Sequence, residues 1–267
     1  MPLRIAVALA IALAFPSGAR AADAAALKVL GFSPDGRYFG FMQYGPQWEA
    51  ERFHAEVFVI DVNRDRFVAG VPLRIIAKMK DDATDDNIAP HLKAFLASVQ
   101  KRATNQFGQH KISKPGALLA RFAEAKADEH SSGSETPAKG AGTDTISAKH
   151  PVLGELKLNL ETKTIDWPKA SRLGAHKEAT SCAEEMDPEK GAAFRLTLER
   201  AGRSIVLHDD KTIPLSRNCT IGYGIVEVHA LDRPDGKVAL AVMLGMHSRG
   251  FEGSDRLFLA VTHVLDR

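Results

Sequence analysis

Apolar and polar residues alternate along much of the chain, with the period of two that is typical of β-strands. In the first third, such segments are separated by short polar turns. The turn Ser33-Pro34-Asp35-Gly36 combines a Pro that presets φ with a Gly that accepts a left-handed conformation. The segments are LKVLGF (27–32), YFGFMQY (38–44), AEVFVIDV (55–62) and RFVAGVPLRII (66–76). Their close spacing predicts an antiparallel β-meander over residues 22–79.

The C-terminal region, residues 150–267, carries the clearest strand pattern. An alternating segment at 153–162 is followed by a hairpin, in which Phe194, Leu196 and Leu198 alternate with polar residues before the turn Ala201-Gly202. Three more strands are expected at 222–231, 237–247 and 256–265. The middle one is apolar at nearly every position, which indicates burial on both faces between two layers.

Between these β regions, residues 80–127 show the period of an α-helix. Ile88, Leu92, Phe95, Leu96 and Val99 fall on one helical face, behind polar residues that suit a helix N-terminus. A second helix is expected after Ser113, with Pro115 in its first turn and Leu118, Leu119 and Phe122 on its apolar face. Residues 128–149 are rich in Gly, Ser, Thr and charge, so a flexible linker is expected there.

The combined pattern predicts a mainly β (α+β) protein, with antiparallel β-meanders packed as a sandwich or barrel-like unit and an inserted helical pair. Residues 150–267 are expected to form one unit with 22–79. Pro34-Asp35-Gly36 recurs 200 residues later as Pro234-Asp235-Gly236, which raises the alternative of a propeller with blades of about 40 residues. No such tripeptide marks the blades between, and helices interrupt them, so a tight turn used twice is the preferred interpretation.

The N-terminus has the pattern of a secretory signal peptide. An apolar run from Ile5 to Phe15 is followed by Ala19-Arg20-Ala21, a small-x-small cleavage pattern. The run has eleven residues, about half of the roughly 20 that a membrane-spanning helix needs. We therefore expect cleavage after Ala21, a secreted or periplasmic protein, and no membrane span after signal removal.

The charge balance argues against a polyanionic partner. The chain has 35 Lys and Arg against 33 Asp and Glu, and loss of Arg4 and Arg20 with the signal peptide leaves 33 of each. Nucleic acids and anionic membranes are recognised through clustered Lys and Arg, so the sequence predicts no nucleic-acid partner.

Cys182 and Cys219 are the two cysteines of the chain. An exported protein meets an oxidising compartment, so we expect them to form a disulfide rather than to remain buried thiols. Closing this loop would contribute about 3–4 kcal/mol to stability on the chain-entropy model.

Three segments resemble a known family. GFSPDGRYFGFMQYG (31–45) with AEVFVIDV, IPLSRNC (213–219) and GFEGSDRLFLAVT (250–262) are similar to a family of predicted secreted bacterial proteins of unestablished function. The resemblance implies export and a single β-rich unit. It implies no reaction, ligand or catalytic residue.

No established catalytic, metal or cofactor motif stands out in the sequence. There is no Gly-x-Ser-x-Gly elbow, and neither DDATDD (81–86) nor His208-Asp209-Asp210 has the spacing of a complete metal site. The best acid–base candidates are Glu227 and His229, which share one strand face, with His247 near them if the neighbouring strands pair. Neither a metal nor a cofactor is therefore predicted.

Binding needs fewer residues than catalysis. Trp48 and Phe251 lie in predicted loops, where each would stack on a sugar or peptide, although a lid over the core is the simpler interpretation of Trp48. Polar contacts, or salt bridges that brace the loops, would come from Arg217, Glu252, Asp255 and Arg256. The favoured function is a non-catalytic envelope protein that binds a partner protein, glycan or peptide. The alternative is a small hydrolase that uses carboxylate or histidine acid–base chemistry around Glu227, His229 and His247.

Overall fold

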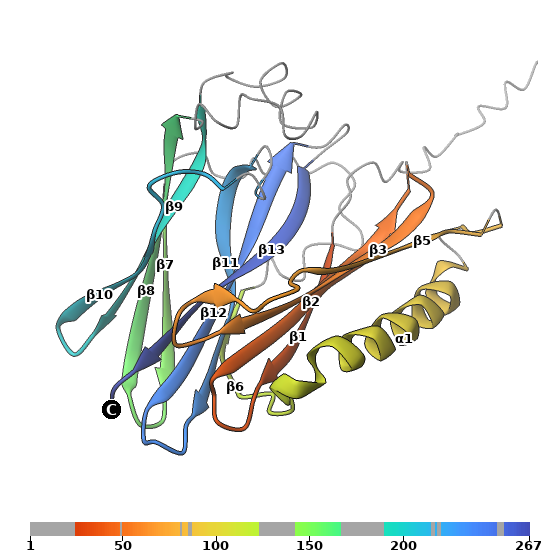
Figure 1. Ribbon diagram of the computed structural model, residues 1–267. Coiled ribbons are helices and arrows are strands. Elements are labelled where there is room, and N and C mark those ends of the chain that lie inside the picture. The colour runs from red at the N-terminus through yellow and green to blue at the C-terminus, as the bar shows by residue number, and fades with distance from the viewer. Residues whose placement is uncertain are drawn as a thin grey trace, which may run out of the picture.

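The computed structural model describes residues 25–48, 50–80, 82–84, 87–122, 142–166, 190–214, 217, 220–249 and 254–267 (Figure 1). Most of these residues form antiparallel strands, so the predicted mainly β class is confirmed. The signal peptide lies outside the described residues. No helix in the described part of the chain is long and apolar enough to cross a bilayer.

The N-terminal sheet contains the predicted meander. Its strands are β1 (Ala26–Phe32), β2 (Tyr38–Gln47), β3 (Arg52–Asp61), β4 (Arg66–Phe67) and β5 (Leu73–Lys78), in the order β1-β2-β3-β4, with β5 also paired to β3. The turn between β1 and β2 is stabilised by Asp35, which accepts hydrogen bonds from the Ser33 hydroxyl and the Arg37 amide. β1 is an edge strand, paired with β2 alone among the described strands.

Two further four-stranded sheets follow. The central sheet has the order β13-β12-β11-β6, from β6 (Ala117–Arg121), β11 (Thr220–Asp232), β12 (Val238–Arg249) and β13 (Ser254–Leu265). The C-terminal sheet has the order β10-β9-β8-β7, from β7 (Gly142–His150), β8 (Gly154–Asp166), β9 (Lys190–Arg200) and β10 (Arg203–Asp209). The predicted hairpin at 194–208 and the three C-terminal strands are all present.

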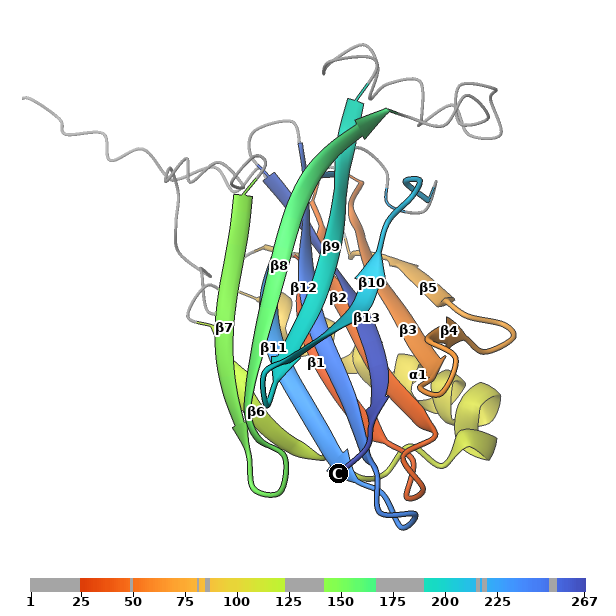
Figure 2. The ribbon, with the colours of Figure 1, turned by 90° about the vertical axis from the view of Figure 1, so that its left-hand side faces the viewer.

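The three sheets stack as layers, with the central sheet between the other two (Figures 1 and 2). β12 shows this most directly, because its side chains alternate between two hydrophobic cores. Leu240, Val242 and Leu244 enter the core shared with the C-terminal sheet, while Ala239 and Ala241 enter the core shared with the N-terminal sheet. The small alanines face the large rings of the N-terminal sheet, so the volumes are complementary. The predicted burial of β12 on both faces is confirmed.

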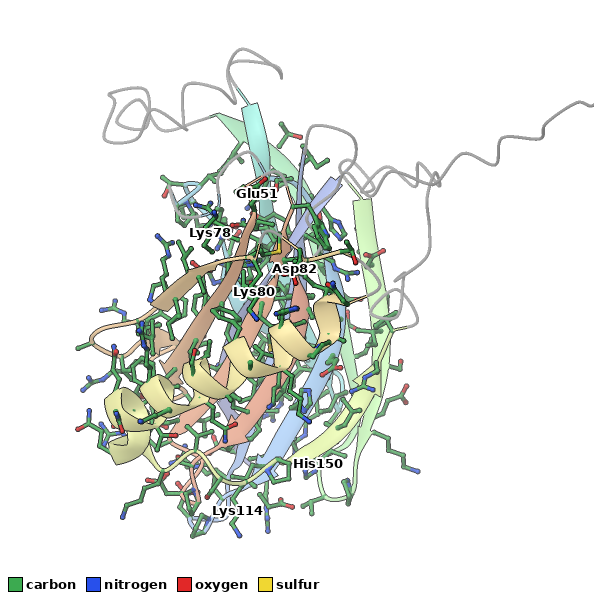
Figure 3. All side chains as sticks on the ribbon, turned by 90° about the vertical axis from the view of Figure 1, so that its right-hand side faces the viewer. Glu51, Lys78, Lys80, Asp82, Lys114 and His150 are labelled. Atoms are coloured by element: carbon green, nitrogen blue, oxygen red, sulfur yellow. The ribbon has the colours of Figure 1, made fainter. Side chains whose placement is uncertain are left out.

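The helix α1 (Ile88–Phe107) adds a fourth layer on the outer face of the N-terminal sheet (Figure 3). Phe95, Val99 and Phe107 are buried against that sheet, and the Phe95 ring stacks on Phe53 at 5.5 Å between centroids. A short 3₁₀ helix, η1 (Gly108–His110), follows directly. The amphipathic pattern predicted around 88–99 therefore marks a real helix.

The predicted helical pair is wrong, because α1 has no α-helical partner among the described residues. Residues 117–121, expected in the second helix, form strand β6 and pair with β11. Local sequence favours either conformation for a short apolar run, whereas β11 offers hydrogen bonds along a whole edge of the central sheet. Gly116, with φ of +71°, also turns the chain away from a helix before the run begins.

The predicted linker over 128–149 is wrong in its last part, since β7 begins at Gly142. Ile146, Ala148 and His150 are buried in alternation with exposed residues, as expected for a strand with one covered face. Residues 123–141 lie outside the described residues. The described sheets form an open stack with no closed barrel. Of the two predicted forms, sandwich and barrel-like unit, the described structure is therefore the sandwich.

Candidate functional site

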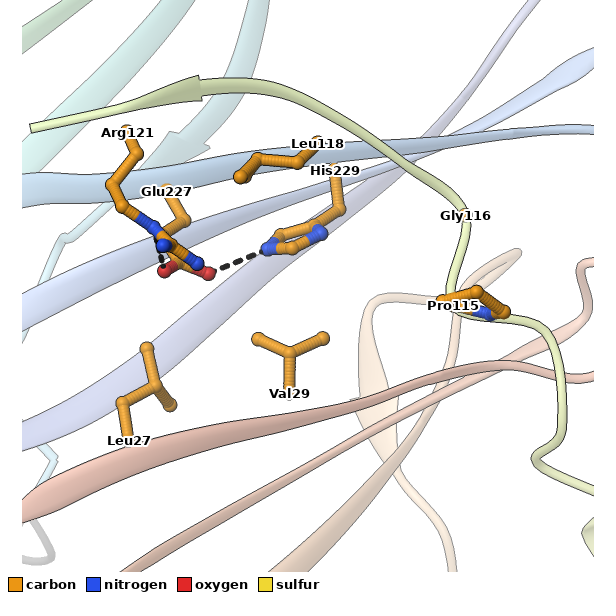
Figure 4. Close-up of a pocket in the computed structure, with 8 residues that line it drawn as sticks. All are labelled: Leu27, Val29, Pro115, Gly116, Leu118, Arg121, Glu227 and His229. Atoms are coloured by element: carbon orange, nitrogen blue, oxygen red, sulfur yellow. Dashed lines mark hydrogen bonds and ion pairs between the residues drawn. The ribbon is translucent and has the colours of Figure 1, made fainter.

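A cleft of about 260 Å³ lies between the N-terminal and central sheets, beside the edge strands β1 and β6 (Figure 4). Leu27 and Val29 project into it from β1. The opposite wall is made by Leu118 of β6 and by Glu227 and His229 of β11. Residues far apart in the sequence therefore build one site at a sheet edge, with mainly apolar walls and a polar floor.

A close approach of backbone to backbone closes one end of the cleft. The Phe32 amide, at the end of β1, donates a hydrogen bond to the Lys114 carbonyl at 2.6 Å. Gly31 has φ of +102°, and a Cβ there would collide with the Lys114 carbonyl oxygen. A Cβ on Gly116 would lie 2.7 Å from the Ala230 carbonyl oxygen. Glycine at these two positions lets the chain cross from one sheet to the other and start β6 beside β11.

Three polar side chains form a continuous network on the cleft floor. Arg121 Nε donates to Glu227 Oε1 at 2.7 Å, and His229 Nε2 donates to Glu227 Oε2 at the same distance. Glu227 and His229 are buried, whereas the Arg121 side chain is 49% exposed. Because Glu227 and His229 are two apart on β11, their side chains share one face of the strand, as the sequence predicted.

The network keeps Glu227 ionised. Burial by itself would raise the pKa of this carboxyl, but the hydrogen bond from His229 and the nearby Arg121 charge outweigh it and lower the pKa below its usual range. The carboxylate thus balances the charge of one cation and holds the His229 ring through Nε2. In the described part of the chain this is the ring's only hydrogen bond, so Nδ1 is the nitrogen left for a ligand or water.

The polar groups on the cleft floor limit the chemistry open to it. No hydroxyl or thiol side chain lines the cavity among the described residues, so Glu227 and His229 are its groups able to act as a nucleophile or a base. His229 oriented by a carboxylate has the geometry of a general base that would activate water. Arg121, anchored through Nε, presents a guanidinium of which half is accessible. No group of three or more His, Cys, Asp or Glu is placed to hold a metal ion within the described ranges.

His247 lies away from this pair. On β12, Met243 is the Cα partner of Glu227, and His247 is four residues further along. This separation corresponds to about 13 Å along a strand. The neighbours of His247 across the sheet are Gly222 and Arg256. The structure therefore brings together two of the three acid–base candidates.

Arg217 belongs to a second polar cluster, on the opposite side of the central sheet. Its Nη1 donates to Asp210 Oδ2 at 2.5 Å, and its guanidinium lies 4.8 Å from the centre of the Phe194 ring. Asp210 also accepts hydrogen bonds from His208 Nε2 and from the Phe194 amide. The Arg217 side chain is 11% exposed, so most of its surface contacts the protein and it braces the structure.

The other predicted ligand-binding residues lie elsewhere in the molecule or outside the described residues. Trp48 is partly buried against the core beneath α1, which agrees with a lid over that core. Arg256 packs over the Phe258 ring at 5.5 Å, and its carbonyl accepts the Ala25 amide. The side chain of Asp255 and the residues Phe251, Glu252, Cys182 and Cys219 lie outside the described residues. The predicted disulfide therefore stays a prediction.

Sequence reasoning missed Arg121, Leu27, Val29 and Leu118 as site residues. Arg121 and Leu118 were expected near or on a helix, and Arg121 meets Glu227 across 106 positions of sequence. The available signal was the Pro115-Gly116 pair. This pair is typical of a turn, such as the one that takes the chain from the N-terminal sheet to the central sheet, and not of a helix start. Leu27 and Val29 carry no signal beyond strand alternation.

The described sheets and α1 define a layered β-sandwich with a helix on one outer face. The chain matches the family described as "Predicted secreted protein (DUF2259)" over residues 40–263 and belongs to that family. This match confirms the resemblance noted in the sequence and the predicted secretion, while a periplasmic location stays a prediction. Neither a curated protein nor a solved structure matches the chain.

Proposed function

We propose that this protein is a non-catalytic binding protein outside the cytoplasm, and that the cleft between β1 and β6 takes a peptide segment with a carboxylate. One observation carries the proposal: a half-exposed arginine is held in place by a buried carboxylate at the floor of an apolar-walled cleft. The partner is a free peptide or an extended segment of another envelope protein.

Arg121 supports recognition of a carboxylate. A guanidinium has five N–H donors in one plane, and the bond from Nε to Glu227 sets the orientation of that plane. No described residue accepts a hydrogen bond from the two Nη atoms, so a ligand carboxylate would accept two parallel hydrogen bonds from them. The ionised Glu227 cancels one charge, so selectivity comes from geometry more than from attraction at long range.

The walls and the neighbouring strand support a peptide. Leu27, Val29 and Leu118 offer an apolar surface, and Leu118 is 45% exposed although it is a large hydrophobic residue. An apolar ligand side chain would cover this surface. β1 is a sheet edge, so a peptide would add to it as a further strand and place alternate side chains in the cleft.

The test is selection of ligands from a library of random short peptides with free carboxyl ends, together with the same library amidated. We expect enriched peptides with an apolar residue near a carboxylate, bound with an affinity that Arg121→Gln lowers about tenfold or more. Arg203→Gln, an exposed arginine on β10, is the matched control. Equal binding by the Arg121→Gln variant, or equal enrichment of amidated peptides, contradicts the proposal.

A second candidate function is hydrolysis with water as the nucleophile, and the Glu227–His229 hydrogen bond favours it. The measurement is turnover of a panel of simple esters and peptides by the wild type and by His229→Gln. Turnover that disappears in the His229→Gln variant would replace the binding proposal. Turnover that survives His229→Gln excludes this role for the pair.

A further inference from the structure

The exposed side of α1 and the segment after it carry an unbalanced positive charge. Residues 87–123 contain six Lys and Arg and no Asp or Glu, although the chain as a whole is nearly balanced. Five of these cations, Lys93, Lys101, Arg102, Lys111 and Lys114, are exposed on this part of the molecule. We call these five residues the α1 basic face.

The fold turns this composition into a surface. Phe95, Val99 and Phe107 are buried against the N-terminal sheet, so the rest of the helix circumference faces outward. At 100° per residue, Lys101 lies opposite the buried stripe, with Lys93 and Arg102 to either side of it. Figure 3 looks onto this side, where α1 crosses the N-terminal sheet as the outermost layer and Lys114 lies below the helix.

The α1 basic face is not neutralised by ion pairs within the described part of the chain. None of its five cations forms an ion pair with another described residue. Some cations on the C-terminal sheet are paired: Lys157 with Glu199 at 3.3 Å, and Lys163 with Asp209 at 2.6 Å. Lysines and arginines left uncompensated on one outer face favour an anionic partner.

We propose that the α1 basic face docks on the anionic phospholipid headgroups of a membrane surface. The protein is secreted from the cytoplasm and meets such surfaces, and each Lys or Arg near them adds an attraction that accumulates over the five cations. α1 has no exposed large hydrophobic residue in the described structure. The helix therefore rests on the headgroups through charge and does not insert into the acyl region.

The test is co-sedimentation of the mature protein with vesicles of pure phosphatidylcholine, or of phosphatidylcholine with phosphatidylglycerol. We expect binding to the anionic vesicles alone, weakened by added salt. The triple variant Lys93→Gln/Lys101→Gln/Arg102→Gln should lower the partition coefficient about a hundredfold. The matched control is Lys149→Gln/Arg195→Gln/Arg203→Gln, which removes the same charge from exposed positions of the C-terminal sheet and should keep most of the binding.

Circular dichroism and thermal unfolding establish that both triple variants are folded, since all six positions are exposed. Equal losses in the two triple variants overturn the proposal, because net charge and not the α1 face would then be responsible. Binding to both vesicle types alike, or to neither, overturns it as well. Retention on a soluble polyanion such as heparin without vesicle binding assigns the face to an anionic polymer instead, and so also rejects the membrane.

Discussion

The central sheet has an arginine–carboxylate pair on each face, and the two pairs differ in what surrounds them. On the side of the C-terminal sheet, Arg217 lies between the Phe194 and Tyr223 rings and binds Asp210, whose side chain is 4% exposed. On the side of the N-terminal sheet, Arg121 binds Glu227 but keeps half of its surface in the cleft. The first pair is enclosed, and the second is open.

Under the proposed function, the difference separates a structural pair from a binding one. Asp210 has its oxygens occupied by His208, Arg217 and the Phe194 amide, and Arg217 also reaches the Tyr223 hydroxyl at 3.3 Å. In the cleft, Glu227 is similarly satisfied, yet no described residue accepts a hydrogen bond from the Nη atoms of Arg121, and its side chain is 49% exposed. The same chemistry therefore braces the fold in one place and, in the proposed function, offers a recognition group in the other.

The largest expected effect is the loss of the enclosed pair. Asp210→Ala leaves the Arg217 charge buried without its partner, and breaking such a pair costs about 3–5 kcal/mol. Glu227→Ala should cost less, about 1–2 kcal/mol, because water reaches the Arg121 guanidinium. Denaturant unfolding of the two variants measures both losses. Equal decreases in the free energy of unfolding would show that burial of the arginine does not make one pair more important for stability than the other.

The disulfide predicted between Cys182 and Cys219 would stabilise the region of the enclosed pair, because Cys219 lies two residues after Arg217 and directly before β11. We expect a mass increase of two protons when the mature protein is reduced, and a loss of about 3–4 kcal/mol in the Cys182→Ser/Cys219→Ser variant. An unchanged mass on reduction would show two free thiols. The Asp210→Ala variant, with both cysteines intact, serves as the reference for disruption of the same region.

Acid should act on both pairs in the same direction. The pKa of Asp210 and that of Glu227 are lowered in the folded protein, against the effect of burial, by their hydrogen-bonded cations. Each carboxylate therefore contributes stability that is complete above its unfolded pKa and is lost as pH falls through the folded value. The free energy of unfolding should decrease below about pH 4.5, and less steeply in Asp210→Asn. A slope unchanged by this substitution would contradict the assignment.

The smallest expected effect on stability comes from Arg121→Gln. A half-exposed arginine with one ion pair contributes about 0–1 kcal/mol, so thermal unfolding should change little. Peptide binding in the cleft should nevertheless fall about tenfold, as proposed above. A large loss of stability with unchanged binding would make Arg121 a structural residue like Arg217 and remove the distinction between the two faces.

Local pattern was a good guide to individual strands. The alternation at Phe194, Leu196 and Leu198, and the turn at Ala201-Gly202, predicted the β9–β10 hairpin that the structure contains. It also placed Glu227 and His229 on one face of a strand. The same reasoning failed for residues 117–121, because a short apolar run satisfies either a helix or a strand until its hydrogen-bonding partner is known.

Average charge was a poor guide to surfaces. The near balance of Lys and Arg with Asp and Glu hides the acid-free segment 87–123. Five of its six cations share one side of the molecule because α1 packs on the N-terminal sheet. A neutral total is compatible with a strongly basic face when the compensating acids lie on other elements. The distribution along the sequence would have shown the segment, and the fold shows that it forms a surface.

The sequence by itself determined the β class, the secretion, most strand positions and the burial of β12 on both faces. Secretion depends on the N-terminal signal pattern, and the other features depend on periodicity and turn chemistry, which act between near neighbours in the chain. The tertiary structure alone decided that Arg121 meets Glu227 across 106 positions, and that Asp210 and Arg217 close the opposite face. Both pairs depend on which sheet edges lie together, and long-range packing sets that order.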